Sequence, residues 1–284
     1  MNNKIKVSII IPTKDKLTRL RLVLKALENQ VDDSIEVIVI FDGNSSETMA
    51  KFYKLNFGFQ LCIIILDKNI GRSAARNRGL NQANGERIIF MDDDVIPGND
   101  FVAKHLSVDN QRWVLMGTTR DTFLSETEIE ELYFGEKIWG DLSFLNEKSR
   151  LIHKPLFMNT LFKIFGNNFP LKWLLFFTNN GSVNKKDLLA GGGFDENFKG
   201  WGHEDIELGY RLQKQGLHFQ KDSSIVGYHL AHGDSYHQKL NESILNLKHF
   251  LKKHREIVVQ AWIRLLILKE NILILLYRMH LLKQ

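Results

Sequence analysis

Three consecutive carboxylates, Asp92, Asp93 and Asp94, are the residues of this sequence whose types and spacing most clearly suit chemistry. Adjacent carboxylates repel one another, and neither a helix nor a hairpin requires three of them in a row. A divalent cation would relieve that repulsion, and oxygen ligands suit Mg²⁺ or Mn²⁺. The triplet therefore indicates a metal site, and a solvated acidic turn is the alternative that this pattern leaves open.

A second candidate is the segment NIGRSAARNRG, residues 69–79, which supplies positive charge. Arg72 and Arg76 are four residues apart and would share one face of a helix that begins here. Guanidinium groups beside the free NH groups of a helix start suit a diphosphate, whereas a surface helix with solvated arginines is the alternative. The sequence contains neither GxxxxGK[ST] nor GxGxxG, so it predicts no P-loop and no dinucleotide fingerprint.

A third candidate is GWGHEDIELGYRLQKQG, residues 200–216, in which Trp201 stands between two glycines and two acids follow it. The alternation of apolar residues after the acids would fit a strand, but the helix formers and the closing Gly216 favour a helix. Glu204 and Asp205 would then lie at its first turn, where they either do chemistry or only cap the helix.

The elements that must position these residues are visible in the first half of the chain. Four short apolar runs end in polar or glycine-bearing turns, namely KVSIII, EVIVIF, LCIIIL and RIIFM. Leucines at helical spacing follow the first run, a serine at 45 or 46 could cap a second helix, and a third helix should stop near Gly85. This alternation predicts a parallel sheet covered on both faces, with its ligand at the carboxyl ends of the strands.

Composition bounds the remaining possibilities. The chain has 284 residues and 44% hydrophobic content, enough for one large domain with an appendage. The single cysteine, Cys62, excludes an intramolecular disulfide and fits a reducing compartment. The first apolar run is too short for a signal peptide, so we expect a cytoplasmic protein. The net charge is +5, and the segment 244–284 alone carries eight basic and two acidic residues, or 8 minus 2, which is +6. The rest of the chain is therefore close to neutral, which argues against nucleic acid as a partner of the main body.

Five blocks of the sequence together resemble a known enzyme family. VSIIIPT, IVIFDGNSSE, NIGRSAARNRGL, IIFMDDDVIP and GGFDENFKGWGHEDIELGYRL are similar to the successive motifs of family 2 glycosyltransferases with the GT-A fold. The last block resembles the galactosyltransferase-type motif of chondroitin polymerases, β-1,4-galactosyltransferases and polypeptide N-acetylgalactosaminyltransferases. The resemblance implies an α/β GT-A fold, with a Rossmann-like, mostly parallel central sheet flanked by helices and a C-terminal helical extension.

The resemblance also implies a nucleotide-sugar site and a metal site. The matching nucleotide-sugar positions are Pro12, Thr13, Asp42, Asn69, Gly71, Arg72, Arg76, Asp92, Asp93, Trp201 and Gly202. Asp42 stands where relatives accept the uracil imide NH, and Phe41 replaces an aspartate that many of them carry. Asp94 and Asp92 match the metal-binding pair of the DxD motif. His229, or alternatively His232, is expected as a further ligand of Mn²⁺ or Mg²⁺.

For catalysis, the resemblance implies that Trp201 lies against the sugar and that Asp205 is the general base for in-line displacement at the anomeric carbon. Glu204 is expected to bind the acceptor or a donor hydroxyl. The reverse assignment stays open, because the glutamate of this pair is the more important in some relatives.

We therefore expect a metal-dependent, inverting transfer of a hexose from a UDP-sugar of the Gal, GalNAc, Glc or GlcNAc type. The acceptor would be a hydroxyl of a glycan, a lipid-linked sugar or a peptide. A sugar nucleotidyltransferase and a non-catalytic nucleotide- or carbohydrate-binding module are the alternatives. The first would require a glycine-rich loop after the first strand, and PTKDKLTRL lacks one.

The expected organisation is a glycosyltransferase domain over 1–240 and a basic, amphipathic helical tail over 241–284. Within the domain we expect a donor half of about 1–118, an acceptor-side insertion of about 120–177 and a catalytic-motif region of 178–240. The tail is too interrupted by Arg264, Lys269 and Glu270 to span a bilayer comfortably. It would pack on the domain, form a homodimer, or lie peripherally on the inner face of a membrane.

Overall fold

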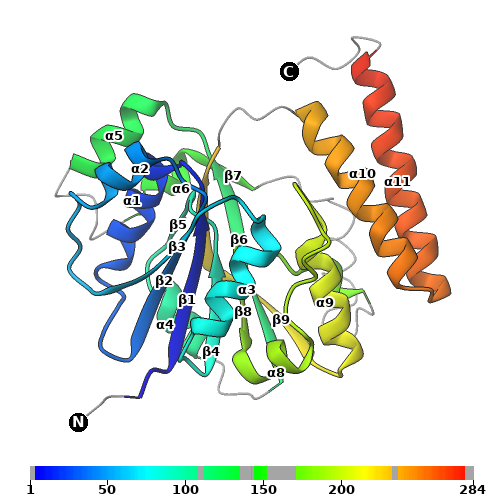
Figure 1. The fold of residues 1–284 in the computed structure, drawn as a ribbon, viewed down its shortest axis with the longest axis horizontal. Helices are drawn as coiled ribbons and strands as arrows, with labels where there is room; N and C mark the ends of the chain where they lie inside the picture. The colour runs from blue at the N-terminus through cyan, green and yellow to red at the C-terminus, as the bar shows by residue number, and fades with distance from the viewer. Residues whose placement is uncertain are drawn as a thin grey trace.

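The four apolar runs form neighbouring parallel strands in the computed structural model, which describes residues 4–107, 112–134, 142, 144–151, 171–231 and 236–278 (Figure 1). Their bounds are β1 Val7–Thr13, β2 Ile35–Asp42, β3 Leu61–Leu66 and β4 Arg87–Met91. Alternate residues of β1 and β2 enter two different hydrophobic clusters, one on each face of the sheet. Burial on both faces explains why the runs of β1, β2 and β4 are almost continuously apolar, whereas β3 lies at the edge of the sheet and exposes Ile63 and Ile65.

Helices cover both faces of this parallel half. The first three are α1 Leu17–Leu27, α2 Ser46–Phe52 and α3 Arg72–Gln82. Leucines of α1 join the cluster on one face, whereas Ala75 and Leu80 of α3 join the cluster on the other. Ser45 caps α2 by accepting a hydrogen bond from the Thr48 NH group at 3.2 Å, as the sequence suggested.

The second half of the sheet departs from the parallel pattern. It contains β5 Val95–Pro97, β6 Trp113–Thr122, β7 Ser149–Leu151, β8 Asn180–Asn184 and β9 His218–Leu230. Within the described residues the strand order is β3-β2-β1-β4-β8-β6-β9-β5, with β7 beside β6. Strand β8 runs antiparallel to both β4 and β6, whereas β6 and β9 pair in parallel. The sheet is therefore mixed, with the predicted parallel arrangement in its first half.

Shorter helical elements surround the second half. They are α4 Phe101–Leu106, α5 Glu126–Phe134, α6 Phe144–Glu147, the 3-10 helix η2 Lys172–Leu175 and α8 Lys185–Ala190. Much of the expected insertion, residues 135–141, 143 and 152–170, lies outside the described residues. The helix expected after the two acids is present as α9, Glu204–Lys214.

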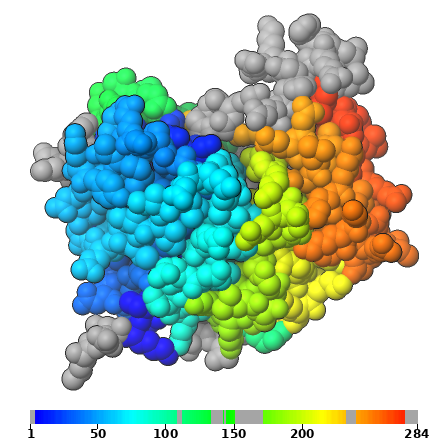
Figure 2. All heavy atoms as spheres, viewed as in Figure 1, coloured from blue at the N-terminus to red at the C-terminus, as the bar shows by residue number. Residues whose placement is uncertain are grey.

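The chain continues into two long helices, α10 Tyr236–Lys253 and α11 Ile257–Arg278, which we call the C-terminal hairpin. Leu247 and Phe250 of α10, with Val259 and Ile263 of α11, belong to the same hydrophobic cluster as the central sheet. The hairpin packs on the main body and forms one side of the molecule (Figures 1 and 2). The boundary expected between residues 240 and 241 falls inside α10. In the part of the chain that the structure describes, no helix is long and apolar enough to cross a bilayer.

Candidate active site

Two adjoining cavities lie where the carboxyl ends of the strands meet α9 and α10. The larger has a volume of about 440 Å³ and the smaller about 110 Å³. The larger is lined by side chains from separate elements, including Arg72, Arg76, Asp92, Asp94, Asp121, Trp201, Glu204, Asp205, His229 and Lys239. The smaller is lined by Pro12, Thr13, Lys14, Lys16, Asp42, Arg72, Arg76 and the acid triplet. Most of the residues predicted from the sequence are therefore brought together.

The acid triplet follows β4 directly, and each of its members has a different partner. The Thr13 hydroxyl donates to Asp93 at 2.7 Å, and the Lys16 ammonium donates to Asp94 at 2.8 Å. Burial, and then the charge of Asp94, raises the pKa of Asp93 to about 7. Thr13, Lys16 and Arg76 thus reduce the repulsion within the triplet without a cation. Lys16 was not identified in the sequence analysis.

Arg76 joins the acid triplet to α9. Its guanidinium, 2% exposed, donates to Asp92 and to Glu204, each at 2.9 Å. Burial disfavours the charged forms of Arg76 and Glu204. The surrounding carboxylates nevertheless raise the pKa of Arg76, and the charges of Arg76 and Arg72 lower the pKa of Glu204. Glu204 is therefore an ionised, buried partner of Arg76.

Asp205 lies beside Glu204 in a different environment. It is half-buried at the wall of the larger cavity, and its Oδ1 accepts a hydrogen bond from the Ile206 NH group at 2.8 Å. Both acids occupy the first turn of α9, where the helix dipole favours negative charge.

His229 is held in an orientation suited to a metal ligand. Its Nδ1 contacts Asp121 Oδ1 at 2.6 Å, and its Nε2 lies 3.8 Å from Asp94 Oδ1. Burial disfavours the imidazolium, but Asp121 and Asp94 outweigh it and raise the pKa of His229. A carboxylate behind the histidine is a common arrangement behind metal ligands. Val95 pairs with His229 between β5 and β9, which explains why the histidine lies beside the triplet.

The donor set fits a divalent cation that also binds substrate oxygens. Neighbouring ligand atoms about 2.1 Å from one octahedral ion lie about 3 Å apart, so the separation of 3.8 Å between Asp94 Oδ1 and His229 Nε2 would have to shorten slightly for both to bind the ion. Among the described residues, no group of three or more His, Cys, Asp or Glu is arranged to hold an ion by itself. The alternative ligand His232 lies outside the described residues.

Asp42, Asn69 and Gly71 are placed differently from the other predicted residues. Asp42 accepts hydrogen bonds from the backbone NH groups of Ile70 and Gly71, at 2.7 and 3.0 Å. These contacts fix the loop that precedes α3, and Gly71 adopts a φ of 92° in it. Asn69 and Gly71 line a separate, more open hollow with Glu196 and Lys199, and only Asp42 reaches the smaller cavity.

The loop Lys199–His203, which carries Trp201, is held from α10. The amide nitrogen of Asn246 donates to the carbonyl oxygens of Lys199, Trp201 and Gly202 at 2.9, 3.2 and 2.9 Å. The Asn246 oxygen accepts from the Lys199 NH group at 3.2 Å. The loop needs this support, because Gly202 has a φ of 97° and His203 a φ of 73°, which is unfavourable for a residue with a side chain.

Three more side chains of α10 contact the same loop. Glu242 accepts from the Trp201 NH group at 2.8 Å, Ser243 bonds His203 Nε2 at 2.7 Å, and the Lys239 ammonium lies 5.7 Å from the centre of the Trp201 ring. Gly200 has a φ of 68°, which disfavours a residue with a side chain, and a Cβ atom there would lie 2.5 Å from a carboxylate oxygen of Glu242, so that the Glu242 side chain would have to shift.

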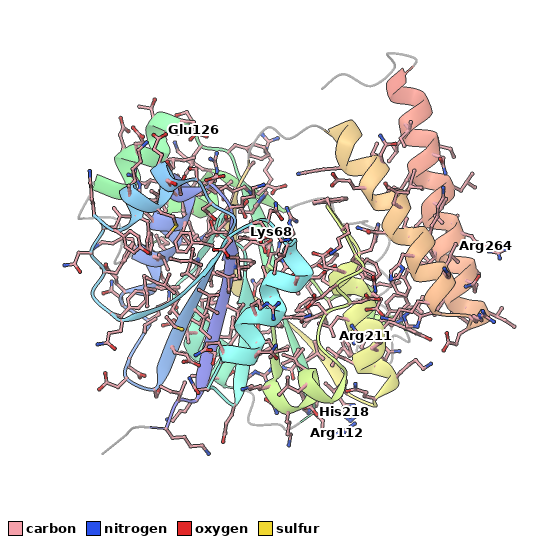
Figure 3. The ribbon with its side chains drawn as sticks, viewed as in Figure 1. Lys68, Arg112, Glu126, Arg211, His218 and Arg264 are labelled. Carbon is pink, nitrogen blue, oxygen red and sulfur yellow. The ribbon has the colours of Figure 1, made fainter. Side chains whose placement is uncertain are left out.

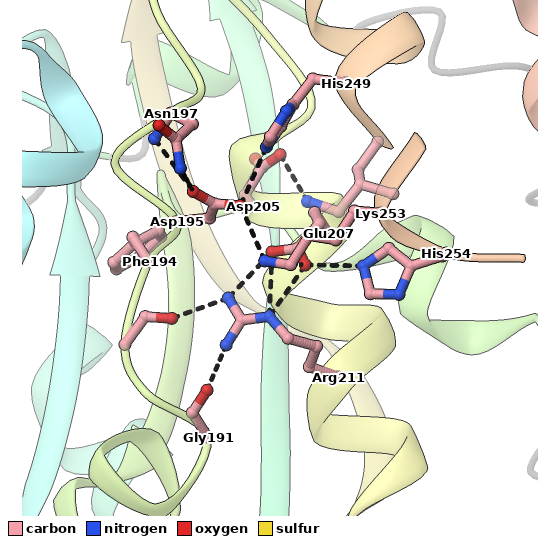
Figure 4. Close-up of polar contacts among 12 residues, drawn as sticks. Gly191, Phe194, Asp195, Asn197, Asp205, Glu207, Arg211, His249, Lys253 and His254 are labelled. Atoms are coloured by element: carbon pink, nitrogen blue, oxygen red, sulfur yellow. Dashed lines mark hydrogen bonds and ion pairs between the residues drawn. The ribbon is translucent and has the colours of Figure 1, made fainter. Parts of the chain in front are cut away.

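A network of polar side chains around the buried Glu207 fastens α9 to α10 one turn further along. Figure 3 labels its member Arg211, and Figure 4 shows the contacts. Glu207 accepts from Arg211 and lies 2.8 Å from His254 Nε2 and 2.9 Å from the Lys253 ammonium. Burial would raise the pKa of Glu207, but these partners lower it to about 2. Asp195 binds Lys253 and His249 in turn, so α9, α10 and the loop before Trp201 form one assembly.

The sequence analysis missed several residues of the larger cavity. Lys16, Asp121, Phe177, Thr178, Asn179 and Lys239 line it. Lys16 and Asp121 had a weak signal, because each is a charged residue at or just after the carboxyl end of a strand. Lys239 had none, because it lies at the end of the expected region 178–240, outside every quoted motif.

Comparisons with known proteins agree with this arrangement. The model of glycosyl transferase family 2 matches residues 8–179, and that of the N-terminal domain of galactosyltransferase matches residues 162–233. An uncharacterized glycosyltransferase of Bacillus subtilis is 29% identical over 80% of this chain and 65% of its own length. A chondroitin synthase of Escherichia coli is 31% identical over 78% of this chain and 34% of its own length. The chain thus spans less than two thirds of the length of these relatives.

Solved structures share the fold at low identity. The Staphylococcus aureus protein TarS, residues 1–349 with UDP-GlcNAc, superposes with a TM-score of 0.59 at 17% identity, over 94% of this chain and 72% of that one. The mannosyltransferase PcManGT of Pyrobaculum calidifontis, with GDP-Man and Mn²⁺, has a TM-score of 0.59 at 16% identity, over 87% of this chain and 63% of that one. With the family model matching more than half of its length, this chain belongs to glycosyl transferase family 2 and has the GT-A fold.

Proposed function

We propose that this chain transfers a hexose from a UDP-sugar to an acceptor hydroxyl, with inversion at the anomeric carbon and with Mn²⁺ or Mg²⁺ as cofactor. The observation that carries the proposal is the convergence of Arg72, Arg76, Asp92, Asp94, His229 and Asp205 on one cavity of about 440 Å³. The structure of TarS with UDP-GlcNAc is consistent with a UDP-sugar donor.

In this proposal the nucleotide occupies the smaller cavity, where Pro12, Thr13 and Asp42 contact the base and ribose. The diphosphate lies between Arg72, at the start of α3, and the acid triplet, because positive charge and free NH groups converge there. The sugar extends into the larger cavity towards Trp201, whose ring and neighbouring glycine shape the wall.

Asp94 and His229 would hold the cation, and Asp92 would assist while bound to Arg76. When bound, the cation would neutralise charge on the departing diphosphate. Arg72 and Arg76 act in the same direction, because the negative charge of the leaving UDP develops beside them. Lys16, now paired with Asp94, would be available to the phosphates once the carboxylate has another partner.

Asp205 would remove the proton of the acceptor hydroxyl as its oxygen attacks the anomeric carbon. Glu204 is less suited to this role, because its carboxylate is committed to Arg76 at 2.9 Å and is buried. We assign Glu204 the task of fixing Arg76, so that it connects the donor site to α9.

The proposal is tested by measuring UDP release from a panel of UDP-sugars in Mn²⁺, with Asp205→Asn, Glu204→Gln and the exposed control Asp33→Asn. Asp205→Asn should keep donor affinity, because the change is nearly isosteric, and should reduce turnover by at least about a hundredfold. Glu204→Gln, unlike Asp205→Asn, should weaken UDP binding, since the Arg76 guanidinium loses a charged partner. Turnover of Asp205→Asn within about threefold of the unmodified chain would move the base role away from this residue.

The same panel separates the proposal from the two alternatives. A nucleotidyltransferase would not release UDP from UDP-sugars, but it would release diphosphate when given UTP and a sugar phosphate. A binding module would release neither product. UDP release that requires an added acceptor identifies transfer, whereas UDP release without one identifies hydrolysis of the donor.

A further inference from the structure

The outer face of α11 carries a regular stripe of exposed apolar side chains. Val258, Leu265, Leu268 and Ile272 are exposed by 62%, 56%, 56% and 47%, and the exposed Ala261 completes spacings of three and four residues. Such spacing places all five on one side of the helix. In Figure 1, α11 is the outermost helix, beyond α10. Because Val259 and Ile263 on the other side of α11 are buried and the stripe residues are exposed, the stripe faces away from the main body.

The exposed stripe is not needed to attach α11 to the rest of the protein. The opposite side of the helix does that, since Val259 and Ile263 are buried and Trp262 packs against the main hydrophobic cluster. Ile274 is buried in a smaller cluster with residues of α10. A helix that is apolar on both sides has a second surface to cover.

Basic side chains border the stripe. Arg264 and Lys269 are exposed beside it, and Figure 3 shows Arg264 on the outer side of α11. At the turn of the hairpin, Lys252 and Arg255 are exposed next to Ile257, which is 86% exposed. The exposed acid of this turn, Glu256, is paired with Lys214 of α9. Glu270 is the only acid in the sequence of α11, and it is buried. The exposed surface of this helix is therefore apolar and cationic.

These charges decide between two occupants of the stripe. If a second copy paired with it as a coiled coil, Arg264 and Lys269 would flank the seam at the positions that face the partner helix. In either orientation of the two helices they would meet like charges, which opposes pairing. An anionic lipid surface instead offers opposite charge to the basic residues and an apolar layer to the stripe.

We propose that the outer face of α11 and the turn of the hairpin form a binding surface for anionic membranes. The helix lies in the plane of the interface, with Leu265 and Leu268 entering the boundary of the acyl chains and the basic residues contacting lipid phosphates. This attachment is independent of the proposed glycosyl transfer, because none of these side chains lines either cavity of the active site.

The test is cosedimentation of the full chain with phosphatidylcholine vesicles, with and without phosphatidylglycerol. Binding should require phosphatidylglycerol and should fall steeply with salt, since attraction at the surface is screened within about 10 Å at 0.1 M. Arg264→Gln with Lys269→Gln should weaken binding about thirtyfold, because each basic residue contributes a factor of about five. Lys51→Gln with Lys54→Gln, exposed positions on or just after α2, is the matched control and should leave binding unchanged.

A second pair of variants tests the apolar part of the surface. Leu265→Asp with Leu268→Asp should abolish vesicle binding and leave UDP binding intact, and Leu189→Asp, at a 47% exposed leucine of α8, is its control. Binding of this double variant at the level of the unmodified chain would overturn the proposal. So would a lack of binding to anionic vesicles at low salt, or a dimer in light scattering that the double variant dissociates.

Discussion

Replacing Asn246 by aspartate should separate donor binding from turnover. Asn246→Asp keeps the size of the side chain and the oxygen that accepts from Lys199, but it removes the donors to three carbonyl oxygens of the loop that carries Trp201. Each such hydrogen bond contributes about 0.5–1.5 kcal/mol. Since part of this loop is exposed and water can replace some contacts, we take about 2 kcal/mol for the three together. The fraction of molecules with the loop in place should then fall by up to about thirtyfold.

The assay is UDP release with the preferred UDP-sugar, alongside calorimetric titration with UDP. Turnover should fall by about tenfold or more, whereas UDP affinity should stay within about twofold, because the loop is remote from the nucleotide cavity. Asn241→Asp, an exposed change of the same chemistry on α10, should behave like the unmodified chain. Ser243→Ala removes the contact with His203 and a hydrogen bond to Glu270 but leaves the Asn246 contacts in place, so it should have a smaller effect in the same direction. Unchanged turnover in a folded Asn246→Asp variant would refute the idea that α10 positions this loop.

Two further outcomes follow from the same site. Asp94→Ala and His229→Ala should each weaken UDP binding in Mn²⁺ far more than in EDTA, and equal weakening in both buffers would remove them from the metal site. Gly202→Ala should cost about 1–2 kcal/mol, because the φ of 97° is unfavourable for a residue with a Cβ atom. It should also lower turnover. Gly192→Ala, at a φ of 79° in open space, is the control and should lower only the melting temperature. Equal turnover in the two variants would contradict the idea that strain in the loop affects catalysis.

Much of the first half of the fold was predictable because its elements depend on local pattern. The leucines of α1 bury one face of a helix, Ser45 caps α2, and the four apolar runs form one half of the sheet, with β3 at its edge. The mixed second half was not predictable in this way. Strand β8 reads NGSVN, with a single large apolar residue, and its place in the sheet depends on pairing with β4 and β6 rather than on periodicity.

The residues of the candidate site also fall into two groups, those with a local sequence signal and those whose role depends on tertiary packing. The acid triplet, Arg76 and Asp205 were singled out because they follow apolar runs or lie at an expected helix start, and because the blocks that contain them resemble motifs of the family. Asn246 and Glu242 were not found, because they resemble ordinary polar residues of an amphipathic helix. Their contacts with the loop around Trp201 arise only from the packing of α10, which no short-range pattern reports.

The ion pair between Arg76 and Glu204 has a consequence for how this chain can be recombined with its relatives. Arg76 lies in the stretch that matches glycosyl transferase family 2 alone, and Glu204 lies in the stretch that matches only the galactosyltransferase model. A chimera that exchanges one stretch would inherit half of this pair. If the incoming stretch lacks the matching charge, a buried guanidinium or carboxylate would be left with an incomplete set of partners, at a cost of about 3–5 kcal/mol. Functional hybrids should therefore be recovered mainly when the two stretches are transplanted together.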